Sequence, residues 1–428
     1  MKRRIEEKLI DWKNRKRMPL LLYGARQVGK TYILTEFGSN HFENTVYVNF
    51  ETDLKTAEYF KDNITPERLI RYLETMVNEE VIPGKTLIIF DEIQSCERAL
   101  TSLKYFCENA PEYHIAAAGS LLGVAVKREN YSFPVGKVET MTLYPMDFEE
   151  FLQALGEERL IEYIRNCYFD MDPMPDALHS RALEHYRYYL IVGGMPAAVS
   201  KFADTGKLIL IPNIQNEISG RYVADMAKYT TPVDVVKIRA CYNSLPAQLA
   251  KENRKFQYKV VQKGGSAAIF GVSIDWLVQA GIALECRRVE HAYMPISVYM
   301  DMSAFKLYLS DIGLLTMQSG ISHQVILMGD GSAFLGAIAE NYIAQALVAN
   351  GHKLYYWTSN HTAELDFVLQ KDSDIIGCEV KKGLHTKSKS LGVFTLKYTP
   401  SYSIRFSEKN FGKREKLFSI PLYAAFCV

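Results

Sequence analysis

A short apolar run followed directly by a glycine-rich loop constrains the fold of this chain more than any other feature. Residues 19–23 predict a buried strand, and the next eight residues, GARQVGKT, fit the phosphate-binding pattern G-x-x-x-x-G-K-[ST]. The glycines allow successive backbone N–H groups to point at one anion. Lys30 is then expected to contact the β- and γ-phosphates of ATP, and Thr31 to ligate Mg²⁺. The residues expected to bind nucleotide here are Gly24, Gln27, Val28, Gly29, Lys30, Thr31 and Tyr32.

A second apolar run, Thr86–Phe90, ends at two acidic residues, Asp91 and Glu92. Such a run is typical of a parallel strand covered on both faces, and ligands bind at the carboxyl ends of parallel strands. Asp91 is therefore expected to bind nucleotide and Mg²⁺, and Glu92 to act as the base or water-positioning residue. An acidic helix start is the alternative for this pair. Ser120, at the end of a strand predicted over 114–118, either senses the γ-phosphate in catalysis or is a turn residue.

The composition describes an ordinary globular chain of 428 residues, long enough for about two to four domains. Its 50 Lys and Arg nearly balance 49 Asp and Glu, so any nucleic-acid surface must be a local patch. Seven scattered cysteines without a C-x-x-C pair fit reduced thiols better than disulfides or zinc. The sequence shows no secretory signal and no apolar run of membrane-spanning length, so we expect a cytoplasmic protein without membrane contact.

Five short stretches make this chain resemble AAA-type P-loop ATPases of the AAA_14 family joined to a DUF4143 region. They are GARQVGKT at 24–31, FDEIQ at 90–94, AGS at 118–120, LYPMDFEEF at 143–151 and VGGMP at 192–196. The resemblance spans essentially the whole chain and implies an ATPase core over 1–150. It also implies ATP binding and hydrolysis at Lys30, Thr31, Asp91 and Glu92. Many relatives carry an arginine after a glycine beyond the sensor strand, whereas this chain has Gly136-Lys137.

Residues 151–235 show helical periods throughout and predict a lid-like region over the nucleotide. Arg187 and Arg221 are either arginine fingers within a homo-oligomer or ordinary surface residues.

Residues 236–325 predict three helices and a hairpin, which together describe a winged helix. The third helix begins after Gly264-Gly265-Ser266, and the strands follow at 282–289 and 305–309. Such a module places its third helix in a DNA major groove or serves as a structural or protein-contact module. Phosphate contacts would come from Ser266 and from a basic, aromatic stretch that contains Lys251, Arg254, Lys255, Phe256, Tyr258, Lys259 and Lys263.

Residues 326–428 predict a helix over 333–350 that carries Glu340, followed by strands at 353–358, 363–370 and 375–381. A four-residue hairpin loop at 371–374 places Phe367 opposite Cys378 and Leu365 opposite Val380. Leu365, Phe367 and Leu369 then share one face, as do Ile376, Cys378 and Val380. The same register places Asp366 opposite Glu379 and Glu364 opposite Lys381.

This register predicts a second catalytic constellation, formed by Asp366, Glu379 and Lys381 with Glu340 from the helix. Two carboxylates bind a hard divalent cation, and an adjacent lysine positions the attacking water. The arrangement resembles the PD-(D/E)xK nuclease family, including Holliday-junction resolvases, which implies Mg²⁺-dependent phosphodiester cleavage with Glu340, Asp366 and Glu379 as metal ligands. A surface ion-pair ladder, or a decayed nuclease fold kept for binding, is the alternative.

Together these patterns predict an α/β multidomain chain with a P-loop parallel sheet, a helical lid, a winged helix and a restriction-endonuclease-like C-terminal domain. The expected function is a Mg²⁺-dependent ATPase acting on nucleic acid, with DNA as the expected polymer, in which hydrolysis gates a conformational step. The alternative is a nucleotide-dependent switch whose inactive nuclease fold binds DNA or protein.

Overall fold

The computed structural model of the chain describes residues 1–15, 18–120, 134–252, 254–329, 332–359, 363–383 and 389–428. Its contacts divide the chain into two compact units. Unit 1 comprises Met1–Tyr144 with Gln279–Gly281, and unit 2 comprises Pro145–Val278 with Ile282–Val428. The four-domain division predicted from the sequence is finer than these two units and stays a prediction.

Unit 1 is built on a five-stranded sheet in the order β2-β3-β4-β1-β5. Every neighbouring pair of strands is parallel. The strand β1 therefore lies between β4 and β5, and its carboxyl end meets those of its neighbours at one edge of the sheet. The strands are β1 Leu20–Tyr23, β2 Asn44–Asn49, β3 Thr86–Asp91, β4 His114–Ala118 and β5 Glu139–Thr142.

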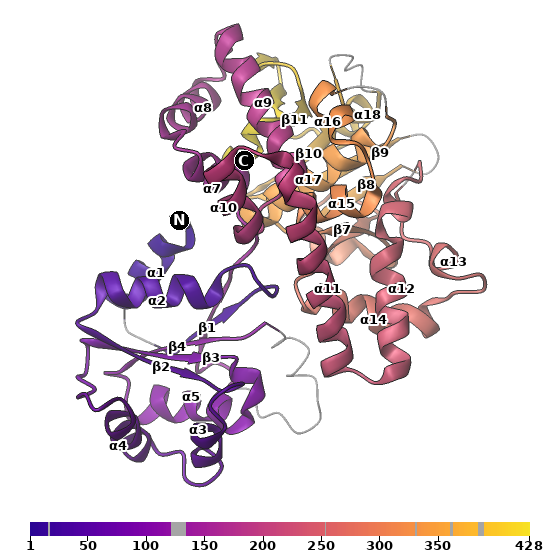
Figure 1. Cartoon of the computed structure of the whole chain (residues 1–428). Coiled ribbons are helices and arrows are strands. Elements are labelled where there is room, and N and C mark those ends of the chain that lie inside the picture. The colour runs from indigo at the N-terminus through magenta and orange to yellow at the C-terminus, as the bar shows by residue number, and fades with distance from the viewer. Residues whose placement is uncertain (16–17, 121–133, 253, 330–331, 360–362, 384–388) are drawn as a thin grey trace. The chain divides into compact units, whose positions relative to one another are not determined.

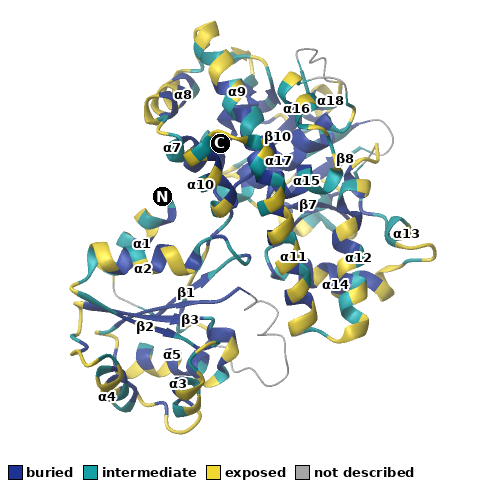
Figure 2. Cartoon of the chain, viewed as in Figure 1, coloured by how far each residue is buried: buried dark blue, intermediate teal, exposed yellow. Residues whose placement is uncertain are grey.

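Helices cover both faces of this sheet, with α1 and α2 on one face and α3, α4 and α5 on the other (Figure 1). All six residues of β3 are buried, which explains its continuous apolar run (Figure 2). Residues of β3 such as Ile88 and Phe90 pack with Leu69 of α4 and Leu100 of α5 in one hydrophobic cluster. The helices are α1 Ile5–Asn14, α2 Lys30–His41, α3 Leu54–Tyr59, α4 Pro66–Val77 and α5 Glu97–Asn109, with the 3-10 turn η1 at Ile93–Ser95.

Unit 2 contains an eight-stranded mixed sheet in the order β12-β13-β11-β10-β9-β8-β6-β7. Because β6 pairs in parallel with β8, the strands predicted for the winged helix and those predicted for the nuclease-like domain belong to one sheet. The strands are β6 Ala283–Val289, β7 Met300–Leu309, β8 Tyr355–Thr358, β9 Glu364–Lys371, β10 Asp374–Val380, β11 Ser403–Ser407, β12 Gly412–Arg414 and β13 Leu417–Pro421.

The helices of unit 2 include the almost fully buried α17, in which Leu335 and the residues 337–347 are all buried. Within the described ranges, no helix is both long and apolar enough to cross a membrane. The helices are α7 Phe148–Ala154, α8 Glu158–Asp170, α9 Asp176–Val192, α10 Pro196–Thr205, α11 Ile211–Tyr229, α12 Pro232–Leu249, α13 Tyr258–Val261, α14 Ala267–Gln279, α15 Ile312–Ser319, α16 His323–Met328, α17 Leu335–Ala349 and α18 Lys389–Tyr398. The 3-10 turns are η2 Leu208–Leu210, η3 Ile296–Tyr299 and η4 Leu422–Cys427.

The register of the β9–β10 hairpin is the predicted one from Lys371–Asp374 to Phe367–Cys378. The predicted pairs Asp366–Glu379, Leu365–Val380 and Glu364–Lys381 lie beyond this paired stretch and stay predictions. The connection is a two-residue turn rather than a four-residue loop, and Asp372 in it has a φ of 51°. This left-handed conformation is one that Asp tolerates better than most residues.

The predicted sharing of one face by Leu365 and Phe367 is wrong. An irregularity in the β8–β9 pairing places Tyr355 opposite Val368 but Trp357 opposite Leu365, so β9 carries one extra residue there. Leu365 consequently packs with Val368 and with Phe394 of α18. The Phe367 ring instead contacts the Tyr308 ring of β7, with centroids 5.8 Å apart.

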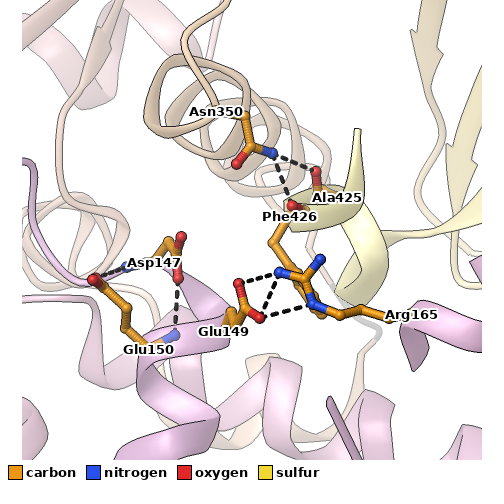
Figure 3. A network of polar contacts seen from close by, with 7 residues as sticks. All are labelled: Asp147, Glu149, Glu150, Arg165, Asn350, Ala425 and Phe426. Atoms are coloured by element: carbon orange, nitrogen blue, oxygen red, sulfur yellow. Dashed lines mark hydrogen bonds and ion pairs between the residues drawn. The ribbon is translucent and has the colours of Figure 1, made fainter. Parts of the chain in front are cut away.

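Polar contacts lie near the start of unit 2 and at its C-terminal turn (Figure 3). Asp147 and Glu150 form a reciprocal capping box at the start of α7. Between them in the chain, Glu149 pairs with Arg165 of α8, whose guanidinium lies 5.5 Å from the centre of the Phe426 ring. Asn350, after α17, donates hydrogen bonds to the carbonyl oxygens of Ala425 and Phe426 at 3.4 and 3.0 Å.

Candidate functional site

The loop between β1 and α2 has the curled backbone that phosphate binding requires. Gly24 has a φ of 148°, and a Cβ at this position would lie 2.2 Å from the carbonyl oxygen of Leu143. Gly29 has a φ of 95° and forms the N-cap of α2. Gln27 also has a positive φ, of 66°. Gly24 and Gly29 therefore adopt positive φ angles that other residues adopt only with strain.

Lys30 is buried inside this loop and already contacts oxygen atoms. Its Nζ donates hydrogen bonds to the carbonyl oxygens of Gly24 and Ala25 at 3.0 and 2.8 Å. It also donates to Ser120 Oγ at 3.1 Å. The structure therefore brings Ser120, at the end of β4, to the loop at the end of β1, as the parallel sheet order requires.

Asp91, the last residue of β3, connects the end of this strand to the phosphate-binding loop through hydrogen bonds. Its Oδ2 accepts a hydrogen bond from Thr31 Oγ1 at 2.7 Å and one from the Tyr47 hydroxyl at 2.8 Å. Its Oδ1 accepts from the backbone N–H of Glu92 at 2.9 Å. A buried carboxylate beside a threonine hydroxyl is an oxygen-only donor set, which fits Mg²⁺.

Glu92 is held in an unusual conformation directly after Asp91. Its φ of 48° and ψ of 42° lie in the left-handed region, which costs a residue other than glycine about 1–3 kcal/mol. Its carboxylate accepts a hydrogen bond from the side-chain amide of Gln94. Burial raises the pKa of Glu92 above its usual value, and Asp91 adds to this rise, whereas Gln94, Lys30 and Arg26 lower the pKa.

Three residues near the site were missed by sequence reasoning. Tyr47 lies on β2, whose residue Asn49 pairs with Asp91, and burial raises the pKa of Tyr47 to about 12. Gln94 belongs to the stretch FDEIQ, but nothing in the sequence gives its side-chain direction. Arg3 donates hydrogen bonds to the carbonyl oxygens of Val28 in the loop and Tyr144 after β5, at 2.8 and 2.7 Å.

The remaining predicted residues of the ATPase site differ in their surroundings. The side chain of Val28 is fully buried, whereas Tyr32 is 51% exposed. In unit 2, Arg187 donates to the carbonyl oxygen of Leu327 at 3.2 Å and lies 3.7 Å from a carboxylate oxygen of Glu408. Arg221 is exposed on α11. The role of an arginine finger stays a prediction for both arginines.

In unit 2, Glu340 contacts side chains from residues 236–325, the range predicted to form the winged helix. Its buried carboxylate lies 3.1 Å from Lys306 Nζ and accepts a hydrogen bond from the Tyr308 hydroxyl, both on β7. It also pairs with Arg254. Lys306 in turn pairs with Glu364 at 2.7 Å. The negative charge of Glu340 is therefore compensated by basic side chains.

The other residues of the predicted metal centre are divided between separate contacts. Asp366 Oδ2 accepts a hydrogen bond from the backbone N–H of Val380 at 2.7 Å. Glu379 pairs with Lys381 at 2.8 Å, and its Oε2 is buried without a hydrogen-bond partner. No group of three or more His, Cys, Asp or Glu in the described part of the chain is arranged to hold a metal ion. The predicted gathering of Glu340, Asp366 and Glu379 around one cation is therefore not what the structure has, because Glu340 turns toward β7.

Comparison with protein families agrees with the architecture of unit 1. Residues 16–152 match AAA_14, described as an AAA domain. Residues 183–325 match DUF8612 and residues 335–424 match DUF4143, both described as domains of unknown function. The chain therefore contains an AAA-type P-loop domain and a DUF4143 region, as the motifs predicted. No curated protein matches the sequence.

Several solved structures share parts of the fold at low sequence identity. The Walker-type ATPase PABY2304 of Pyrococcus abyssi is 15% identical, with a TM-score of 0.43 over 73% of this chain and 94% of that chain. A single-residue variant of RuvB from Thermotoga maritima is 13% identical, with a TM-score of 0.32 over 65% and 87%. The ORC2 protein of Aeropyrum pernix is 10% identical, with a TM-score of 0.32 over 80% and 91%.

Proposed function

We propose that this chain is a Mg²⁺-dependent ATPase that acts on nucleic acid and uses ATP hydrolysis to drive a conformational step. The ATPase activity is supported by one observation, the polar side chains that lie together at the carboxyl ends of β1, β3 and β4. Lys30 contacts Ser120, and Thr31 contacts Asp91, with Glu92 next in the chain. This is the set of groups that phosphoryl transfer from ATP requires.

Each side chain has a distinct role in this proposal. Lys30 exchanges its carbonyl contacts for the β- and γ-phosphates and compensates their charge. Thr31 and Asp91 hold Mg²⁺, which when bound neutralises charge on the phosphates. Glu92 accepts the proton of the attacking water, and its raised pKa brings it closer to the range in which a carboxylate is an effective base. Ser120 keeps the Lys30 ammonium at the end of β4.

The test is ATP turnover by the full chain, together with binding of a non-hydrolysable ATP analogue. We expect Lys30→Ala to lose affinity for nucleotide. Glu92→Gln should bind ATP normally but lower kcat by about 10²–10⁴-fold, since only transition-state stabilisation is removed. Glu58→Gln, at an exposed position of unit 1, is the matched control and should be unchanged. Normal turnover by Glu92→Gln would show that Glu92 is not the base.

The nucleic-acid part of the proposal rests on local charge. Lys251, Lys259 and Lys263 are exposed around α13 and are available to phosphates. Other residues of the predicted basic stretch are less available, because Arg254 pairs with Glu340 and Phe256 is buried. A winged helix over 236–325 stays part of the proposal and is supported by the order α12, α13, α14, β6 and β7.

A nucleotide-dependent switch that binds a protein is the second candidate, and one observation favours it. Helix α14, the proposed recognition helix, contains no Lys or Arg and exposes Ile269 and Val272, which are 44% and 77% accessible. A helix that enters the major groove normally uses polar or charged side chains on base edges and phosphates. An exposed apolar face is more typical of a protein contact.

Phosphodiester cleavage by unit 2 is the most specific part of the proposal. It is supported by the Glu379–Lys381 pair at the end of β10 and by the position of Asp366 on the paired strand β9. The engagement of Glu340 by Lys306 and Arg254 favours the alternative, in which a nuclease-like fold is kept for binding.

A further inference from the structure

Gln94 is a close polar neighbour of Glu92 in the chain, and the roles proposed above leave it unused. It lies in the 3-10 turn η1, two residues after Glu92. Only 5% of the residue is exposed, and its amide Nε2 donates a hydrogen bond to Glu92 Oε2. Because Gln94 is buried and donates to the Glu92 carboxylate, it can fix the orientation of that carboxylate.

The backbone around this contact leaves Glu92 little freedom. The N–H of Ser95 donates to the carbonyl oxygen of Glu92 at 2.9 Å, and that of Cys96 donates to Ile93 at 3.0 Å. Ile93 is fully buried in the hydrophobic cluster of unit 1. The turn is therefore anchored in the core, so the side-chain torsions of Glu92 are the main remaining freedom. The hydrogen bond from Gln94 restricts them.

We propose that Gln94 is a positioning residue of this ATPase, whose amide holds the Glu92 carboxylate in the orientation that accepts a proton from the attacking water. This role rests on the proposed ATP hydrolysis, in which Glu92 is the base. Glu92 would depend on Gln94 for its orientation. Gln94 itself touches neither nucleotide nor water in this role. It acts only through Glu92.

The experiment compares wild type, Gln94→Leu, Gln94→Glu and the control Gln324→Leu, which alters an exposed glutamine on α16. Steady-state ATP hydrolysis and binding of a non-hydrolysable ATP analogue are measured in parallel. We expect both Gln94 variants to lower kcat by about 10–100-fold, within the range of general-base effects. KM and analogue affinity should change less than about twofold, because the interaction belongs to the catalytic step.

Gln94→Glu is nearly the same size as glutamine, so it decides the question if the leucine variant does not fold. An unchanged kcat in a folded Gln94→Glu variant overturns the role. A kcat loss that is accompanied by an equal loss of analogue affinity also overturns it, since that result reflects packing alone. A wild-type chain that hydrolyses no ATP overturns the proposed ATPase and this role with it. Active wild type with unaffected Gln94 variants overturns the role of Gln94 alone.

Discussion

Asp91 shows how a single residue in this site depends on neighbours from several elements. Its Oδ2 receives one hydrogen bond from Thr31 of α2 and another from Tyr47 of β2, and its Oδ1 receives the N–H of Glu92. The Tyr47 hydroxyl is itself an acceptor for the Asn49 side chain at 3.3 Å. The orientation of this carboxylate is therefore set before any cation binds.

Tyr47→Phe tests this orientation by removing only the hydroxyl group. A hydrogen bond to Asp91 that contributes about 0.5–1.5 kcal/mol corresponds to an increase of about 2–10-fold in the Mg²⁺ concentration needed for half-maximal ATP hydrolysis. The KM for ATP at saturating Mg²⁺ should remain near the wild-type value. The measurement is a Mg²⁺ titration of steady-state turnover. Tyr105→Phe, on the exposed side of α5, is the control, and equal titrations of the two variants would contradict the role of Tyr47.

At the scale of elements, an ion pair joins α7 to α8, and only one of its two partners is buried. The Glu149 side chain is 6% accessible, whereas Arg165 is 47% accessible, and their closest atoms are 2.6 Å apart (Figure 3). The pair is bidentate, because Arg165 Nε and Nη2 both donate to Glu149. Truncation of the exposed partner leaves the buried carboxylate with fewer donors.

We therefore expect Arg165→Ala to destabilise unit 2 by about 1–3 kcal/mol, the usual cost of a buried acceptor that loses its donors. The measurement is urea-induced unfolding followed by circular dichroism. Arg159→Ala, at an exposed position on the same helix, controls for the loss of an arginine from α8. Equal unfolding midpoints for the two variants would mean that the Glu149–Arg165 pair contributes nothing measurable.

At the scale of the whole molecule, the near-neutral net charge of +1 makes a local patch the only electrostatic route to nucleic acid. We expect the full chain to bind labelled single strands, duplexes or junctions with an affinity that falls steeply as salt rises. Replacement of Lys251, Lys259 and Lys263 by alanine should reduce the slope of log K against log salt by up to about three. The control replaces the exposed lysines Lys55, Lys61 and Lys85 of unit 1.

The same incubations, with Mg²⁺ or Mn²⁺ and with or without ATP, decide among the proposed functions. Absence of binding at low salt would favour the protein-binding switch. If the chain cuts nucleic acid, Asp366→Ala and Lys381→Ala should abolish cutting while ATP hydrolysis continues. Binding without cutting by the wild type would leave a nuclease-like fold used for contact.

The sequence alone determined two kinds of feature in this protein. In one, the functional residues are neighbours in the chain, and in the other they are brought together by the order of parallel strands. The loop residues 24–31 lie next to one another, so their roles follow from spacing. Asp91, Glu92 and Ser120 could be placed beside them because parallel strands bring their carboxyl ends to one edge. The β9–β10 register next to the turn was predictable for a similar reason, since a short hairpin leaves few ways to bury two alternating apolar strands.

Only the tertiary structure decided which side chains meet when no local rule connects them. Tyr47 and Gln94 reach the site through side-chain directions, and the extra residue in β9 follows from its pairing with β8 rather than with β10. Glu340 could be expected on a buried helix, but its partners Lys306 and Tyr308 lie on β7, much earlier in the chain. A buried carboxylate takes whichever compensating charge packing brings nearest, because the cost of leaving it unpaired exceeds any local preference. That choice depends on the order of strands in the sheet, which spacing along the chain does not specify.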